Sequence, residues 1–224
     1  MAYSIAIDGP AGAGKSTIAK LLAEKLGYIY VDTGAMYRAM AVYFSQNHVN
    51  PEDEREINAA VINVDITIEY MDGAQQVILN GDNVTKLLRT EETGKMASKT
   101  SKYGAVRSKL VDLQRKLAKT TDVIMDGRDI GTTVLPDAFA KIYLTASSDA
   151  RAQRRYDELV AKGQECDYQV IKEDIESRDY EDMHREISPL KQAEDAVLVD
   201  TSDMNIEQVV SAIEKIIEEK KAVL

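Results

Sequence analysis

Short apolar runs that favour strands alternate along the chain with stretches whose apolar residues recur at helical spacing. This alternation is typical of a parallel sheet covered by helices. The predicted strands are residues 3–8, 28–31, 122–126, 141–145 and 196–200. The pattern therefore predicts an α/β fold with a five-stranded parallel core sheet flanked by helices.

Two helices are clear from periodicity alone. After residue 17 the apolar residues recur at helical spacing, and Gly27 follows as a plausible C-cap. The members of this first set are Ile18, Leu21, Leu22 and Leu26. A second stripe near the C-terminus, with Glu and Lys on its opposite face, is Ile206, Val209, Val210, Ile213, Ile216 and Ile217. We assign the second stripe to packing.

One segment, between the second and third predicted strands, departs from this alternation. Apolar residues at 64, 66, 68 and 70 alternate with polar neighbours, and residues 77–79 form a second apolar run. Asp72-Gly73 marks a turn between them, and Asn80-Gly81 is a strong signal for a tight turn. We therefore predict a small antiparallel β insert over residues 63–84. It is either a plain hairpin or a mobile module that closes on a second substrate, and the pattern leaves both open.

The composition limits the class of protein. The chain has 224 residues, of which 44% are hydrophobic and 29% charged, enough for one substantial core or two small domains. We expect a single domain over residues 1–224. Because it carries neither an apolar stretch of membrane length nor a signal-peptide pattern, we expect a cytoplasmic protein without a membrane partner.

Charge and cysteine content narrow the partners further. A formal net charge of −10 argues against nucleic acid, so any polyanion must bind in a local basic cleft. The acidic surface, without an obvious exposed apolar stripe, favours a monomer. A single cysteine, Cys166, excludes an intrachain disulfide and, with only two histidines beside it, makes a Cys/His metal cluster implausible.

The most specific motif is GPAGAGKST at residues 9–17, which matches G-x-x-x-x-G-K-[ST] between the first predicted strand and the first predicted helix. A phosphate-binding loop needs glycines that let backbone N–H groups turn inward and a helix N-terminus that faces the anion. Lys15 can bridge the β- and γ-phosphates of a nucleotide, and the Ser16 hydroxyl can bind Mg²⁺. The alternative is a glycine-rich turn with one solvated lysine. The predicted nucleotide-binding residues are Gly9, Pro10, Ala11, Gly12, Ala13, Gly14, Lys15, Ser16 and Thr17.

Two charged clusters follow predicted strand ends, where open α/β sheets bind ligands. The first is DTGAMYR at residues 32–38, in which a short helix would project Arg38 one turn beyond Gly34. The second is DGRD at residues 126–129. Its strand-terminal Asp126 resembles the acid that holds the water shell of Mg²⁺ in P-loop enzymes. The alternative there is a turn with a surface ion pair.

Two further sets of charges recur at helical spacing. The first set is Arg151, Arg154 and Arg155, behind a Ser147-Ser148 N-cap, and the second is Arg178, Asp182 and Arg185. Such faces are either solvated or, for arginines beyond a strand end, able to close over a transferring phosphoryl group. The spacing alone leaves both readings open.

Taken in order, GPAGAGKST, DTGAMYR, MASK at residues 96–99, DGRDIGT and RDYEDMHR closely resemble the bacterial cytidylate kinases. The resemblance runs over nearly the whole chain, and the ordered set is far more specific than any motif except the loop. It implies a P-loop kinase core, a monophosphate-binding insert and a helical lid at residues 148–168. It also implies transfer of the γ-phosphoryl group of ATP to CMP or dCMP, with Mg²⁺.

The resemblance assigns individual roles by position. It implies contacts with the acceptor nucleotide and its phosphate for Arg38, Arg128 and Arg185, a cytosine-reading group of Ser98, Arg107 and Asp129, and contacts with the pentose or phosphate for Arg178 and Asp182. Thr33 and Tyr37 of the DTGAMYR motif are also expected at the acceptor. The expected catalytic residues are Lys15, Arg128, Asp129 and the lid arginines Arg154 and Arg155, and the expected metal ligands are Ser16 and Asp126.

This chemistry has a physical logic. The attacking group is a phosphate oxygen that is already anionic at neutral pH, so no strong general base is needed. Two alternatives remain: another P-loop kinase acting on AMP, UMP or a non-nucleotide acceptor, and a GTP-driven switch that binds partners. The switch would carry an N/T-K-x-D guanine-reading motif, which the sequence lacks.

Overall fold

The computed structural model describes residues 2–71 and 73–222. These residues form two compact units. The first, called here the N/C unit, contains the described residues up to Tyr30 and from Thr121 onward; the second, the middle unit, is Val31–Thr120. The boundary falls within strand β2 (Ile29–Asp32). The expected organisation as one domain stays a prediction.

The N/C unit is built on a parallel sheet. Within the described residues this sheet has five strands in the order β2-β6-β1-β7-β8. Strand β1 is Ser4–Asp8, β6 is Val123–Gly127, β7 is Ala140–Thr145 and β8 is Val197–Asp200. β1 pairs in parallel with both β6 and β7, and β7 pairs in parallel with β8. The five predicted strands are confirmed, each bound lying within one residue of the observed bound.

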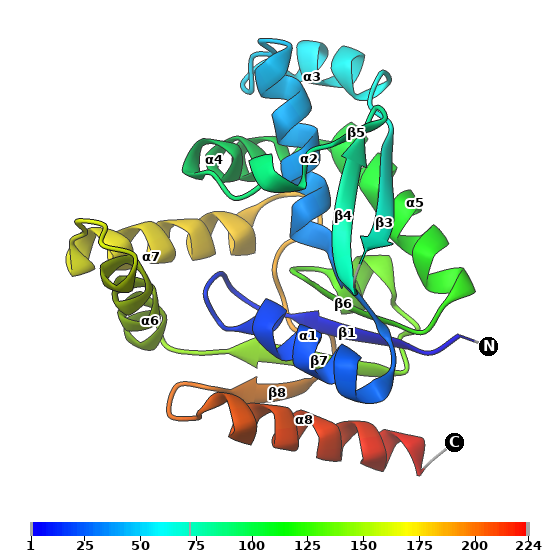
Figure 1. Ribbon diagram of the computed structural model, residues 1–224, viewed down its shortest axis with the longest axis vertical. Helices are drawn as coiled ribbons and strands as arrows, with labels where there is room; N and C mark the ends of the chain where they lie inside the picture. Colours follow the sequence, from blue (N-terminus) through cyan, green and yellow to red (C-terminus); the bar gives the residue numbers. More distant parts are fainter. Residues whose placement is uncertain (1, 72, 223–224) are drawn as a thin grey trace. The chain divides into compact units, whose positions relative to one another are not determined.

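Helices α1 (Lys15–Leu26) and α8 (Ile206–Lys221) pack on this sheet, and α8 runs beside β8 (Figure 1). Their apolar residues share one core with β1, β6, β7 and β8. α1 ends at Gly27 as predicted, in the left-handed conformation that glycine adopts most easily. Two predicted core positions, Leu21 and Ile206, are instead exposed. On α1 the buried face is completed by the small residues Ala19 and Ala23, which a search for large apolar residues overlooks.

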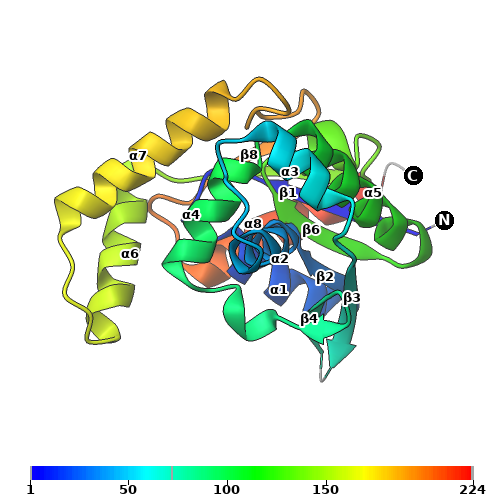
Figure 2. The same cartoon turned by 90° about the horizontal axis from the view of Figure 1, so that it is seen from above.

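Helices α6 (Ser148–Ala161) and α7 (Tyr168–His184) pack side by side in the N/C unit (Figures 1 and 2). As predicted, a serine caps α6: the Ser147 side chain accepts a hydrogen bond from the backbone N–H of Ala150. The segment expected to be a lid, residues 148–168, covers α6 and its connection to α7. Its role as a lid stays a prediction. A π-helical turn, η2 (Ile130–Val134), follows β6.

The middle unit contains four described α-helices and a small sheet. The helices are α2 (Thr33–Gln46), α3 (Glu54–Val61), α4 (Glu91–Thr100) and α5 (Gly104–Thr120), and a 3₁₀ turn η1 covers Thr85–Leu87. The strands are β3 (Ile66–Met71), β4 (Ala74–Leu79) and β5 (Asp82–Asn83), and β4 packs beside α2 (Figure 1). The short helix expected after residue 32 is the long α2, because Met36, Met40 and Phe44 extend its buried face.

The antiparallel insert is confirmed and contains one strand more than the alternation revealed. β3 pairs with β4, and β4 pairs with β5 across a turn at Asn80-Gly81. The φ angles of Asn80 and Gly81 are 49° and 92°, and positive values at both positions are what a tight type I′ turn requires. β5 has only two residues, too few for a periodic signal. Of the other predicted turn, Asp72 lies outside the described residues.

No helix within residues 2–71 and 73–222 is long and apolar enough to cross a membrane.

Candidate active site

The loop from Gly9 to Thr17, called here the phosphate loop, joins the end of β1 to the start of α1. A Cβ atom added at Gly9 would lie 1.9 Å from the carbonyl oxygen of Leu144, so the loop can pass β7 only with glycine at this position. Gly14, the N-cap of α1, has a φ of 85°, and its left-handed conformation turns the chain into the helix. The backbone of residues 9–17 therefore has the close glycine approach and the helix N-terminus that a phosphate-binding loop requires.

The Lys15 side chain is 6% exposed, and its Nζ atom donates a hydrogen bond of 2.7 Å to the carbonyl oxygen of Pro10. Burial, together with the nearby positive charge of Arg128, lowers the pKa of Lys15 to about 7, against the opposing effect of the carboxylates of Asp126 and Asp8. Two cations are thus held close together within the N/C unit. Such an arrangement favours an anionic ligand, which would restore full protonation of Lys15.

Next to Lys15, Ser16 donates a hydrogen bond of 2.8 Å from its hydroxyl to Asp126 Oδ2. The Tyr30 hydroxyl donates to the other carboxylate oxygen of Asp126, also at 2.8 Å. Asp126 lies near the end of β6, so the strand and the phosphate loop bring together a hydroxyl and a carboxylate, the oxygen ligands that Mg²⁺ prefers. The two predicted metal ligands therefore meet and fit a Mg²⁺ site. Tyr30 was not predicted, because nothing in its local sequence indicates a contact with a residue 96 positions away.

Asp8, the last residue of β1, is a buried carboxylate that the sequence analysis treated only as a strand end. Its two oxygens accept hydrogen bonds from the backbone N–H groups of Ile130 at 2.8 Å and Gly131 at 2.7 Å. Burial raises the pKa of Asp8 to about 6, although these two hydrogen bonds oppose the shift. Asp8 thereby fixes the start of η2 directly behind Asp129. The only sequence signal was an acidic residue directly after three apolar residues, 5–7, of a predicted strand.

A cluster of opposite charges links the end of β6 to α7. Arg128 Nε donates to Asp182 Oδ2 at 2.8 Å. Arg185, the C-cap of α7, has guanidinium nitrogens 3.6 Å from Asp182 Oδ1 and 3.7 Å from Asp129 Oδ1. Burial alone would raise the pKa of Asp182, but the charge and hydrogen bond of Arg128 and the charges of Arg178 and Arg185 together outweigh it, and the pKa lies below its ordinary value. The structure thus brings together four predicted site residues from two motifs, within one unit.

The three arginines of α6 make three different contacts. Arg151 is buried and donates to the carbonyl oxygen of Ala11 in the phosphate loop at 3.0 Å. Arg154 donates to the Thr201 backbone carbonyl and, at 3.2 Å, to the hydroxyl of the same residue. Arg155 lies 2.9 Å from Glu158 in an ion pair whose side chains are both about half exposed. The catalytic roles assigned to Arg154 and Arg155 stay predictions. Among the described contacts of these three arginines, the one to the phosphate loop comes from Arg151, which belongs to the helix-spaced set but received no role from the resemblance.

The middle unit holds the other predicted acceptor residues. Thr33 is the buried first residue of α2, behind the N-cap Asp32, and Arg38 lies one turn further along. The guanidinium of Arg38 passes within 3.1 Å of where a Cβ at Gly34 would be, so glycine leaves room for it.

A second group in this unit lies on α5. Arg107 is 4% exposed, its guanidinium lies 5.7 Å from the ring centre of Tyr37, and it donates to the Ser101 carbonyl oxygen at 3.3 Å. The Ser101 hydroxyl in turn donates to the carbonyl oxygen of Ser98 at 2.8 Å. The middle unit therefore brings Tyr37, Arg107 and the end of α4 together. The predicted acceptor residues are thus divided between two units.

The five-stranded parallel sheet, its flanking helices and the phosphate loop together form a P-loop kinase fold. A solved shikimate kinase from Acinetobacter baumannii, in complex with shikimate, superposes with a TM-score of 0.52 over 99% of this chain and 96% of that chain, at 13% sequence identity. At that identity the likeness concerns the fold alone.

Sequence comparison gives the family. A family model described as cytidylate kinase matches residues 5–219. The chain is 52% identical over 216 residues to a cytidylate kinase of Leuconostoc mesenteroides, covering 96% of each chain. It is 51% identical over 217 residues to a cytidylate kinase of Lactobacillus gasseri, covering 97% of this chain and 94% of the relative. The chain belongs to the cytidylate kinase family.

Proposed function

We propose that the protein transfers the γ-phosphoryl group of ATP to CMP or dCMP, giving ADP and CDP or dCDP. Membership of the cytidylate kinase family supports the substrates. The structural observation that carries the proposal is that Ser16 of the phosphate loop donates to Asp126 at 2.8 Å, which brings the loop with Lys15 to the end of β6, just before Arg128. Burial and the positive charge of Arg128 both lower the pKa of Lys15, so an anion bound here would stabilise the charged form of the lysine. A phosphoryl group in transfer between two phosphates is such an anion.

We propose that the phosphate loop, Gly9–Thr17, holds ATP. Its backbone N–H groups and the N-terminus of α1 would contact the phosphates, and Lys15 would bridge the β- and γ-phosphates. The phosphate oxygen of CMP attacks without a general base, because it is already anionic. The protein's contribution is to align two polyanions that repel each other and to offset their charge.

We propose that Ser16 and Asp126 hold Mg²⁺, since their oxygens already meet at 2.8 Å. When bound, the ion would neutralise negative charge on the phosphates of the donor. Tyr30 keeps the Asp126 carboxylate in place from its other side.

Residues of both units are proposed to recognise the acceptor, on the strength of the family resemblance. In the N/C unit these are Arg128, Asp129, Arg178, Asp182 and Arg185, and in the middle unit Thr33, Tyr37, Arg38, Ser98 and Arg107. Asp129 is the proposed reader of cytosine. The exocyclic amine of cytosine donates a hydrogen bond to a carboxylate, whereas uracil presents an acceptor at the same place. We propose in addition that Arg154 and Arg155 act as lid arginines over the donor phosphates, and that the enzyme works as a cytoplasmic monomer.

An assay of ADP release with Mg²⁺ and ATP tests the function. CMP, dCMP, UMP, AMP and no acceptor are compared in parallel at equal concentration. We expect turnover with CMP and dCMP to exceed that with UMP and AMP, and ADP release without acceptor to be the slowest. A preference for AMP, or equal release with and without acceptor, would contradict the proposal.

A further inference from the structure

Arg151 occupies the position at which three segments of the N/C unit meet. Its Nε atom donates to the carbonyl oxygen of Ala146 at 2.9 Å, and its Nη1 atom donates to the carbonyl oxygen of Ala11 at 3.0 Å. Its Nη2 atom lies 2.5 Å from Asp179 Oδ2 on α7. One side chain, 5% exposed, therefore contacts the segment after β7, the phosphate loop and α7.

The stem of Arg151 also packs against the phosphate loop. A Cβ atom added at Gly12 would lie 3.5 Å from Arg151 Cβ and 3.8 Å from its Cγ and Cδ atoms. The arginine thus contacts the loop twice, through its aliphatic stem at Gly12 and through its guanidinium at Ala11. A change in the loop backbone at these residues would therefore displace the guanidinium group of Arg151.

Asp179, the partner of Arg151 on α7, lies next to the proposed acceptor residues of that helix. It follows Arg178 in the chain and lies three residues before Asp182, which Arg128 binds. Asp179 Oδ1 is buried and finds no hydrogen-bond partner among the described residues. Because a buried carboxylate oxygen without a donor costs free energy, the pair is not arranged for stability alone. Such departures from optimal stability are typical of functional sites.

We propose that Arg151 is a positioning residue that couples the phosphate loop to α7, so that a nucleotide on the loop and an acceptor at α7 bind cooperatively. The inference rests on the proposed function, because it takes α7 as part of the acceptor site. An occupied loop holds the Ala11 carbonyl in one orientation, and Arg151 and Asp179 then hold α7. The acceptor meets a helix that is already ordered and so loses less conformational entropy on binding. By linkage, the acceptor strengthens nucleotide binding by the same factor.

Calorimetric titration of CMP into the full chain tests this coupling. The titration is done in Mg²⁺ buffer with and without a saturating, non-hydrolysable ATP analogue. For the wild type we expect the analogue to lower the Kd of CMP by about fivefold or more. In Arg151→Lys, which keeps the charge but loses the three-way fork, we expect the two Kd values to agree within about twofold. Asp179→Asn should have the same effect, and the double variant should show no further loss.

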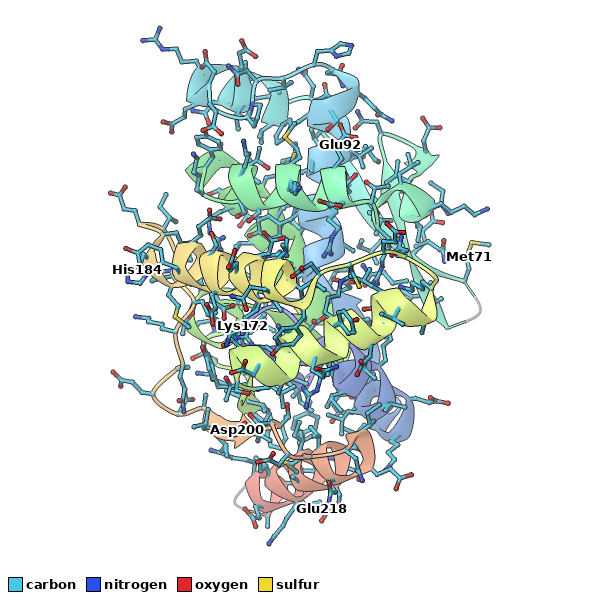
Figure 3. All side chains as sticks on the ribbon, turned by 90° about the vertical axis from the view of Figure 1, so that its left-hand side faces the viewer. Met71, Glu92, Lys172, His184, Asp200 and Glu218 are labelled. Atoms are coloured by element: carbon cyan, nitrogen blue, oxygen red, sulfur yellow. The ribbon has the colours of Figure 1, made fainter. Side chains whose placement is uncertain are left out.

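A matched control comes from the second ion pair between the same two helices. Lys172 Nζ on α7 lies 2.7 Å from Asp149 Oδ1 on α6, and none of its described contacts is with the phosphate loop (Figure 3). Lys172→Met therefore removes a contact between α6 and α7 without touching the link to the loop. We expect this variant to keep the coupling of the wild type.

The outcomes separate the inference from the function on which it rests. If CMP binds the wild type equally with and without the analogue, or if Arg151→Lys and Asp179→Asn keep the coupling, the inference is wrong while the proposed function stands. If CMP binds in neither condition, the proposed function is wrong. Should Arg151→Lys fail to fold by circular dichroism, the nearly isosteric Asp179→Asn carries the test. A merely structural link would change stability and leave the ratio of the two Kd values as in the wild type.

Discussion

The phosphate loop and the helix pair α6–α7 belong to the same unit, but their polar groups are held in place differently. The loop relies on its own backbone: glycines at fixed positions, a helix N-terminus and one lysine, all within residues 9–17. The helix pair relies on side chains whose partners lie far away in the chain, such as Arg128 with Asp182 and Arg151 with Ala11. The loop is thus a local device, whereas α7 is held by contacts that exist only in the folded protein.

From this difference we expect substitutions in the loop to lower activity, and substitutions between β6 and α7 to lower the free energy of unfolding as well. In the loop, removing the charge of Lys15 would remove its proposed contact with the reacting group. Between β6 and α7, removing one charge takes the shortest ion pair from a largely buried cluster, so the free energy of unfolding should fall as well.

The largest effect is expected from Lys15→Met. Loss of the cation on the transferring phosphoryl group should lower kcat/KM by about 10²–10⁴. The side chain is buried and methionine matches its shape, so the fold should persist. The control is Lys25→Met on the same helix, where Lys25 forms an exposed ion pair with Glu214. Steady-state kinetics check both, and equal losses in the two variants would contradict a special role for the loop.

The second prediction concerns Asp8, behind the loop. Its pKa is about 6 in the native state against an ordinary value of 3.8. Between these values the native state keeps the proton and the unfolded state has lost it, so stability present at low pH is lost as the pH rises to 6. Relative to Asp8→Asn, the wild type should lose about 2 kcal/mol of unfolding free energy between pH 4 and 6. Urea unfolding at several pH values measures this, and parallel curves for the two proteins would show that Asp8 titrates normally.

The third prediction compares two arginine pairs. Arg128→Met leaves the buried Asp182 with only the more distant Arg185, at 3.6 Å, and should lower the unfolding free energy by about 2–3 kcal/mol. This is below the full value for a buried pair because a fifth of the Arg128 side chain is exposed. Arg155→Met breaks the exposed pair with Glu158 and should cost less than about 1 kcal/mol. Denaturant unfolding compares the two, and similar losses would mean that burial does not separate the pairs.

The smallest effect is expected for base choice. Asp129→Asn replaces a pure acceptor with a group that also donates, so uracil should be tolerated better. The ratio of kcat/KM for CMP to that for UMP should fall by a factor equivalent to about 1–3 kcal/mol. Competition between the two acceptors in one reaction measures this ratio directly. An unchanged ratio would remove Asp129 from the cytosine-reading group.

Features that depend on a local sequence pattern could be predicted, whereas contacts between residues distant in the chain could not. The five strands, the phosphate loop and the Gly27 C-cap are local patterns, and the structure confirms them. Ser16 and Asp126 were both expected as metal ligands, from the loop motif and from the resemblance of Asp126 to the acid of P-loop enzymes, and their side chains meet at 2.8 Å.

The partners of the α6 arginines and the burial of Asp8 depend on tertiary contacts, which leave no local signal in the sequence. Spacing put three arginines on one face of α6, but only the fold gives Arg151 the loop, Arg154 the Thr201 carbonyl and Arg155 a neighbour on its own helix. The burial of Asp8, which raises its pKa, likewise has no periodic signature. β5 was missed because two residues make no pattern.

The most direct test of the account follows the phosphoryl group itself. ATP labelled at the γ-phosphoryl position is incubated with CMP, Mg²⁺ and the enzyme, and the products are separated. The account predicts that the label appears in CDP, and that Lys15→Met prevents the transfer. Label that accumulates only as inorganic phosphate, with CMP unchanged, would contradict phosphoryl transfer to the acceptor.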